Sequence, residues 1–107
     1  MSRFAEVLAR LSAVIASRQG GDPTRSYTAK LLADPALAAK KLGEEAIEAV
    51  IAATLCDETA LAAESADLIY HWLVVLAAAG VSLDEVAAKL EAREGVSGLD
   101  EKAGRSK

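Results

Sequence analysis

The sequence predicts an all-α fold, an antiparallel helical bundle of four main helices plus a short one. The first observation is compositional: 52% of the 107 residues are hydrophobic but only 4% are aromatic, so the apolar side chains are mainly Ala, Leu and Val. Such residues favour closely packed helices, and β-branched or aromatic runs typical of strands are scarce. The second is that apolar residues recur at helical spacing, and the third is that capping residues precede these segments. A chain of this length forms about one domain.

The N-terminal part predicts one long helix and one short helix. The long helix ends near Arg18, and its apolar face repeats every three to four residues. That face consists of Phe4, Val7, Leu8, Leu11, Val14 and Ile15. The segment QGGDPT at 19–24 has a glycine pair and a proline, which is typical of a loop. Ser26 can cap a short helix at 26–33, SYTAKLLA.

Two long helices follow, joined by a short turn. Asp34 can cap the first of them, and Pro35 suits its first position, so we expect this helix to run to Leu55. The segment CDET interrupts the apolar pattern. We expect the next helix at about 58–79, ended by Gly80, whose freedom at positive φ suits a helix C-terminus.

The last helix is expected to begin at SLDE, residues 82–85, a capping-box pattern, and to continue through about Arg93. The remaining segment, 95–107, has no apolar period and contains three glycines counted from Gly95. We therefore expect a helical domain at 1–94 and a flexible tail at 95–107.

Charge, cysteine content and segment length narrow the class of protein. Twelve basic and sixteen acidic residues give a net charge of −4, which argues against a general nucleic-acid binder. Cys56 is the only cysteine, so no intrachain disulfide and no cysteine-rich zinc site is expected. The N-terminus lacks a signal-peptide pattern, and the most apolar segment, 68–80, is too short to cross a bilayer. We expect a cytoplasmic protein that binds neither nucleic acid nor membrane.

An acidic stripe begins the third predicted helix. At about 100° per residue, Glu45 lies about 60° and Glu44 about 40° from Glu48 around the helix, so the three form one acidic stripe. Lys40 and Lys41 precede the first two glutamates by four residues, so ordinary surface ion pairs are an alternative explanation for that pair. Glu48 is harder to explain in this way because its neighbours are almost all apolar.

A second stripe lies on the next helix, where Glu64, Asp67 and His71 also share one face. The short turn makes the two helices antiparallel neighbours, and Glu48 and Glu64 lie at similar distances from it. Carboxylates that face each other repel unless a cation lies between them. No basic residue occurs between Glu44 and Ala79, so a divalent metal is the expected cation, and oxygen ligands suit Mg²⁺ or Mn²⁺. A di-iron bundle is an alternative, but it normally needs two Glu-x-x-His motifs.

A further expectation concerns the apolar run WLVVL at 72–76. One small bundle does not offer enough surface to cover helices this apolar, so we expect the run to remain exposed and to form a homodimer interface.

The two stripes also carry a resemblance to a known family. EEAIE at 44–48 and ESAD at 64–67, separated by fifteen residues, resemble the EExxE…ExxD signature of the all-α nucleotide pyrophosphohydrolases. More narrowly, the chain resembles the phosphoribosyl-ATP pyrophosphohydrolases of histidine biosynthesis over nearly its whole length. The segments that carry this resemblance are SYT, KLGEEAIE, ESADLIYHWLVVL, GVSLDEV and, from Arg93, REGVSGLDEKA.

The resemblance implies Mg²⁺-dependent removal of pyrophosphate from phosphoribosyl-ATP, leaving phosphoribosyl-AMP, by a homodimer whose bundles are completed across the interface. The metal ligands that it implies are Glu45, Glu48, Glu64 and Asp67. Glu44 would hold or deprotonate the attacking water, or bind a further metal.

Six other residues are candidates for substrate binding: Ser26, Tyr27, Lys30, Lys41, His71 and Arg93. The basic ones can complete a phosphate cradle, although each also has an explanation as a solvated surface charge. Ser26 and Tyr27 can contact ribose or phosphate, but Ser26 can also be only a helix cap. His71 is as well explained by a structural hydrogen bond.

Two other functions are compatible with the same residues. A house-cleaning pyrophosphohydrolase would keep the chemistry and act on non-standard nucleoside triphosphates. A non-catalytic helical dimer would use the acidic stripes to bind a structural cation.

Overall fold

The computed structural model describes residues 2–95, and within that range the chain forms helices and no strand. The all-α prediction is confirmed. The helices are α1 (Arg3–Ser17), α2 (Tyr27–Leu32), α3 (Pro35–Thr54), α4 (Glu58–Ala79) and α5 (Leu83–Glu91). Each predicted boundary lies within about two residues of the observed one. The predicted tail lies outside the described residues from 96 onward.

The helix ends agree with the sequence because local side chains define them. Ser26 and Asp34 each accept a hydrogen bond from a backbone N–H in the first turn of the helix that follows. Ser82 and Glu85 form the predicted reciprocal capping box, with bonds of 3.1 and 2.7 Å. Gly80 ends α4 at φ 74°, a left-handed conformation that glycine adopts at little cost.

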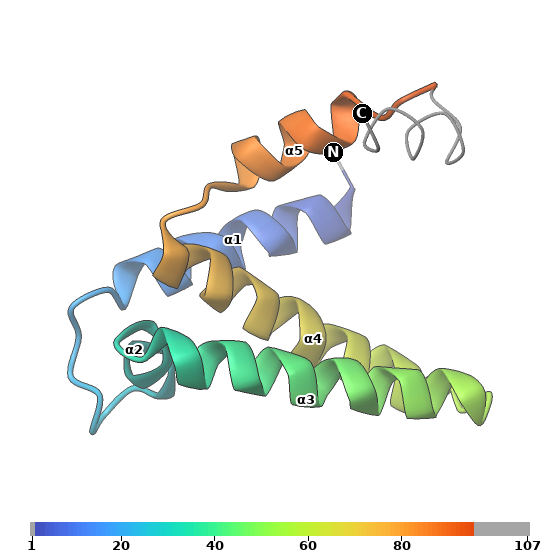
Figure 1. Cartoon of the computed structure of the whole chain (residues 1–107), viewed down its shortest axis with the longest axis horizontal. Helices are drawn as coiled ribbons and strands as arrows, with labels where there is room; N and C mark the ends of the chain where they lie inside the picture. The colour runs from blue at the N-terminus through green and yellow to red at the C-terminus, as the bar shows by residue number, and fades with distance from the viewer. Residues whose placement is uncertain (1, 96–107) are drawn as a thin grey trace, which may run out of the picture.

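Helices α3 and α4 lie side by side and antiparallel, and they form the most extensive helix contact in the molecule (Figure 1). α1 and α2 both contact α4, and α2 also contacts α3. In Figure 1 these two helices lie toward the end of the hairpin where α3 begins and α4 ends, while the turn between α3 and α4 projects away from them. The hairpin is therefore covered at one end only.

The hydrophobic core lies at the covered end. Its six buried residues come from four helices: Ile15, Leu31, Leu32, Ala38, Leu73 and Val74. The prediction that residues 72–76 remain exposed is wrong, because α1 and α2 cover this part of α4. Leu73 and Val74 are 4% and 0% exposed, and Trp72 packs against the core.

Exposed apolar residues gather instead on the projecting end of α3, and others lie on α1, such as Phe4 at 62% exposed. Ile47, Val50, Ile51 and Leu55 are between 52% and 72% exposed. These residues flank Glu48, which is itself exposed rather than enclosed by its apolar neighbours. Residues 2–95 leave this surface uncovered.

α4 has 22 residues and is long and apolar enough to cross a membrane by length and composition. The expectation that the apolar segment is too short was based on 68–80 alone, whereas the helix that contains it begins at Glu58. One such helix is weak evidence, because the central helix of a bundle passes the same test, and α4 contacts α1, α2 and α3.

Candidate metal centre

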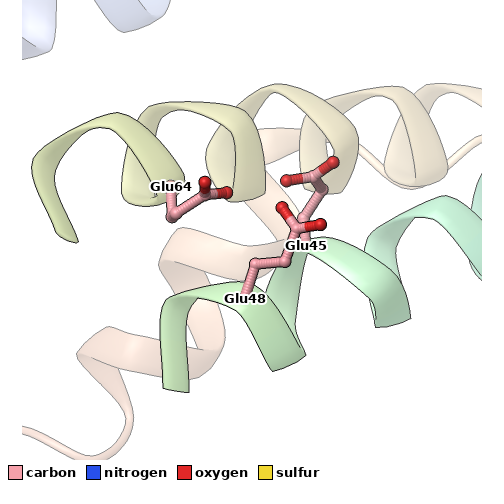
Figure 2. A group of neighbouring side chains, drawn as sticks. All are labelled: Glu45, Glu48 and Glu64. Carbon is pink, nitrogen blue, oxygen red and sulfur yellow. The ribbon is translucent and has the colours of Figure 1, made fainter. Parts of the chain in front are cut away.

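Three carboxylates meet between α3 and α4. Glu45 and Glu48 project from α3 and Glu64 from α4, and all three point toward the same space (Figure 2). Each offers one oxygen atom, and these atoms all lie within 4.8 Å of one another. The spacing of three residues on α3 places both glutamates on the side that faces α4. The two predicted stripes therefore face each other at these three positions.

Two oxygen atoms of this cluster are buried without a partner. Oε2 of Glu45 and Oε2 of Glu64 have no hydrogen-bond partner among the described residues. A buried, unpaired carboxylate oxygen costs free energy that a bound cation would recover. Glu48 is exposed, so the cluster is open to solvent on one side. Three carboxylates at this spacing fit a hard divalent cation such as Mg²⁺ or Mn²⁺.

The close approach of the carboxylates changes the acidity of Glu64. Its pKa is raised from 4.5 to about 7, first because a protonated Glu64 can donate a hydrogen bond to Glu48, which the ionised form cannot. Desolvation and repulsion from Glu48, and then the hydrogen bond and repulsion from Glu45, act in the same direction. At neutral pH one of the three carboxyl groups is therefore partly protonated, which is the state expected of an acidic cluster without its cation.

Asp67 follows Glu64 by one turn of α4, and the structure does not bring its carboxylate into this group of three. The side chain is exposed. Its backbone carbonyl accepts a hydrogen bond of 2.8 Å from Nδ1 of His71, so Nδ1 carries the hydrogen. Ligation of a metal by Asp67 stays a prediction.

Glu44 lies beside the cluster and forms an ion pair. Its Oε2 is 3.3 Å from Nζ of Lys41, three residues earlier, whereas the sequence suggested Lys40 as its partner. Both side chains are partly exposed. Lys41 therefore lies close to the carboxylates. Glu44 forms an ion pair with it, whereas Glu45, Glu48 and Glu64 form none among the described residues.

C-terminal to the carboxylates, α4 carries Tyr70 and His71, and His71 contacts Tyr27 of α2. His71 is buried, and its ring packs edge-on against Tyr70 at 4.9 Å and against Tyr27 at 6.2 Å between centroids. The Tyr70 hydroxyl also shares a hydrogen bond with Thr28. The predicted substrate residues Tyr27 and His71 are thus brought together, and His71 does make a structural hydrogen bond.

The remaining candidates are more scattered. Ser26 caps α2, with Oγ 3.1 Å from the backbone nitrogen of Ala29, so its capping role is confirmed. Lys30 is exposed in the last turn of α2, and Arg93 is exposed just after α5.

A cavity of about 230 Å³ adjoins the cluster on the side of the α3–α4 turn. Its lining comprises Glu48, Ile51, Ala52, Leu55, Asp57, Ala60 and Glu64. Asp57 was expected only as part of the turn, where it does cap α4. Its position beside the cavity depends on how the turn folds back, and no local pattern in the sequence indicates this.

Comparison with known proteins identifies the family of this chain. Residues 8–94 match the family model described as phosphoribosyl-ATP pyrophosphohydrolase. The chain belongs to this family. The resemblance noted in the sequence is confirmed, and membership makes the chain an enzyme of the pyrophosphohydrolase type.

Similar curated proteins share nearly their whole length with this chain. A protein of Caulobacter vibrioides is 69% identical over 104 residues, which is 97% of each chain. One from another Caulobacter species is 70% identical over 105 residues, 98% of each chain. One from Dinoroseobacter shibae is 58% identical over 100 residues, 92% of this chain and 98% of its own. All three are named phosphoribosyl-ATP pyrophosphatase.

Proposed function

We propose that this enzyme hydrolyses phosphoribosyl-ATP to phosphoribosyl-AMP and pyrophosphate in a Mg²⁺-dependent step of histidine biosynthesis in the cytoplasm. The names of its relatives support the substrate. The observation that carries the Mg²⁺ dependence is the cluster of Glu45, Glu48 and Glu64 with its two unpaired buried oxygens. Carboxylates alone would repel a triphosphate, so an acidic site can act on this substrate only if a cation reverses its charge.

Glu45, Glu48 and Glu64 would hold the Mg²⁺, and Asp67, one turn further along α4, is the fourth ligand that we propose. When bound, the ion would supply positive charge opposite the phosphate oxygens as charge develops on them. The exposed position of Glu48 leaves an open side from which a phosphate chain can approach.

Glu44 is our candidate for the group that accepts a proton from the attacking water. It lies next to the ligand Glu45 in sequence, and its ion pair with Lys41 fixes one of its oxygens. The reaction consumes one water and breaks the P–O bond between the α and β phosphoryl groups. The oxygen of the water ends on a product phosphate, which initially keeps one hydrogen, and the other proton would pass to Glu44 and then to solvent.

Tyr27 and His71 offer a surface for the adenosine part of the substrate. Tyr27 is 49% exposed, so much of its side chain is available for stacking, and its contact with His71 fixes its position. Lys30 and Arg93 remain candidates for contacts with phosphate oxygens.

We also propose that the enzyme is a homodimer. The exposed apolar residues of α3 are one support, and two largely apolar cavities are another. One cavity, of about 280 Å³, is lined by Leu42, Leu68, Ile69 and Trp72. A second copy of the chain would cover such surfaces and complete a bundle around the projecting hairpin.

The test is pyrophosphate release from phosphoribosyl-ATP by the purified chain, with Mg²⁺ and with EDTA. We expect turnover with Mg²⁺ only. Faster turnover of dUTP or another non-standard triphosphate would instead indicate a house-cleaning enzyme. A rise in melting temperature with Mg²⁺ but no hydrolysis of either substrate would indicate a cation-binding helical protein without this activity.

A further inference from the structure

Another cavity lies in the loop between α1 and α2. It has a volume of about 480 Å³, and it is lined by Ser17, Arg18, Gly21, Asp22, Arg25 and Ser26. Its lining is polar and partly basic, whereas the cavities on the surfaces of α1, α3 and α4 are mainly apolar. Of these lining residues, only Ser26 was among the substrate-binding candidates predicted from the sequence.

The charges of this cavity favour an anion. Arg18 and Arg25 contribute two positive charges and Asp22 one negative charge, so the lining is net positive on a chain whose net charge is −4. Within residues 2–95, no hydrogen bond or ion pair engages the guanidinium of Arg18. Arg25 is 88% exposed, and its Nε is 3.8 Å from Asp22, which is a loose contact that an anionic ligand can replace.

Asp22 organises the loop rather than neutralising the arginines. One of its oxygens accepts hydrogen bonds from the backbone nitrogen and the hydroxyl of Thr24, at 2.9 and 2.7 Å. These two bonds lower the pKa of Asp22, so its carboxyl group stays ionised and the turn stays formed at neutral pH.

The cavity is formed before any ligand arrives. The backbone N–H of Gly21 donates to the carbonyl of Arg18 at 3.0 Å, and Ser26 caps α2 on the opposite side. A Cβ atom at Gly21 would lie 3.0 Å from that carbonyl oxygen and 3.4 Å from the Cβ of Ala29, so the backbone approach is close. A site whose backbone is already fixed loses less conformational entropy when a ligand binds.

The position of the cavity relates it to the carboxylate cluster. Glu64 and His71 lie on one face of α4, and seven residues of helix separate them by about 10 Å. Tyr27 contacts His71 on that face. Ser26 directly precedes Tyr27 in the sequence and lines the loop cavity. The order along this surface is therefore acidic cluster, aromatic pair and basic cavity.

We propose that the loop cavity is a phosphomonoester subsite, in which Arg18 and Arg25 bind the phosphate of the substrate's phosphoribosyl group. This rests on the proposed function, because phosphoribosyl-ATP carries a triphosphate at one end and a phosphomonoester on the ribose attached to the base. The acidic cluster, through its cation, takes the triphosphate, and the guanidinium groups take the phosphate at the far end. No bond changes at the far phosphate, so this subsite provides binding and selects substrates that carry that group.

The test compares steady-state kinetics of three variants with the parent enzyme. The double variant R18Q/R25Q removes both positive charges, and R10Q is the matched control, an exposed arginine on α1 that does not line the cavity. D22N removes the negative charge but keeps an oxygen that can accept the bonds from Thr24. We expect R18Q/R25Q to raise KM for phosphoribosyl-ATP at least tenfold with kcat within about threefold, R10Q to have no effect, and D22N to lower KM.

Inhibition by product analogues separates the two ends of the substrate. Phosphoribosyl-AMP should inhibit R18Q/R25Q at least tenfold more weakly than the parent, while AMP, which lacks the second ribosyl phosphate, should inhibit both equally. An unchanged KM in R18Q/R25Q overturns the subsite and leaves the proposed function intact. A rise in KM in D22N as well would show loop damage rather than lost charge, and would also overturn it.

If the parent enzyme does not hydrolyse phosphoribosyl-ATP, the proposed function fails and a binding measurement decides on the subsite. Ribose 5-phosphate is then titrated into the labelled chain while backbone amide signals of residues 18–27 are followed by NMR. Saturable shifts that disappear in R18Q/R25Q support a phosphomonoester site in its own right, and an absence of shifts overturns it.

Discussion

The two ends of the α3–α4 hairpin have similar amino-acid compositions and opposite environments. At the end where α4 finishes, Leu73 and Val74 are buried against α1 and α2. At the end near the turn, Ile51 and Leu55 are 52% and 72% exposed, although they belong to the same kind of Ala-, Val- and Leu-rich helix. The two ends differ in exposure because α1 and α2 pack against one end of the hairpin and do not extend to the other.

This comparison shows where the chain's stability and its chemistry reside. The core at the covered end holds the fold together, so the projecting end does not need to be optimised for packing within the chain. The three clustered carboxylates come from Glu45, Glu48 and Glu64, toward the projecting end, where repulsion and unpaired oxygens can be tolerated. We infer that the covered end supports the site and that the projecting end carries it.

The largest effect expected is on activity. Glu48→Gln and Asp67→Asn each remove a proposed negative ligand with almost no change of shape, and we expect a loss of at least about 100-fold in kcat/KM. Without metal, both variants should be as stable as the parent or more stable. Glu48→Gln reduces repulsion within the cluster, and the side chain of Asp67 is exposed outside it. Pyrophosphate-release assays and thermal melts in EDTA measure the two effects.

Glu58→Gln is the matched control, since Glu58 is an exposed glutamate in the first turn of α4 and outside the cluster. It should retain activity. Mg²⁺ should raise the melting temperature of the parent and the control, and raise that of Glu48→Gln much less. Full activity in Glu48→Gln would contradict a metal site at this position.

The next effect concerns stability at the two ends of the hairpin. Leu31→Ala, at a fully buried core position, should lower the free energy of unfolding by about 2–5 kcal/mol because it leaves a cavity. Ile47→Ala, at a position 63% exposed, should cost less than about 1 kcal/mol in the isolated chain. Urea unfolding at low protein concentration compares the two, and equal losses would contradict the contrast between the ends.

The proposed dimer provides a further test of the exposed surface. Ile51→Glu places a charge on the apolar face of α3, and we expect it to weaken self-association at least about tenfold while the helical content is preserved. Light scattering over a range of protein concentrations gives the molecular mass, and circular dichroism checks the fold. A parent chain that is monomeric at micromolar concentration would rule out this dimer.

The smallest effect expected is a dependence of metal binding on pH. The pKa of Glu64 is raised to about 7 in the fold, so folding favours its protonated form. This contribution to stability is present below about pH 4.5, the ordinary pKa, and is lost as pH rises through about 7. Mg²⁺ requires the ionised form, so below pH 7 its binding must displace a proton.

The rise in melting temperature caused by a fixed Mg²⁺ concentration should therefore be larger at pH 8 than at pH 6. Glu64→Gln should show only a small rise at both values, because it lacks the titrating group. A larger rise at pH 6 than at pH 8 in the parent would show that protonation of Glu64 does not compete with the metal.

The sequence by itself determined the helices and most of the cluster. Helix boundaries follow from bonds made within three or four residues, as at Asp34 and Ser82, so the local pattern contains the information needed to place them. The meeting of Glu45 and Glu48 with Glu64 follows from helical spacing and a short turn, which together leave one antiparallel arrangement.

The tertiary structure decided which apolar residues are buried and which polar groups meet across elements. The run 72–76 is covered because α1 and α2 lie on it, and neither packing partner can be identified from the run itself. The exposed carboxylate of Asp67, the aromatic contact of Tyr27 with His71 and the basic loop cavity likewise depend on how separate helices are placed. Burial and long-range contacts are properties of pairs of elements, whereas helix formation is largely a property of one element and its caps.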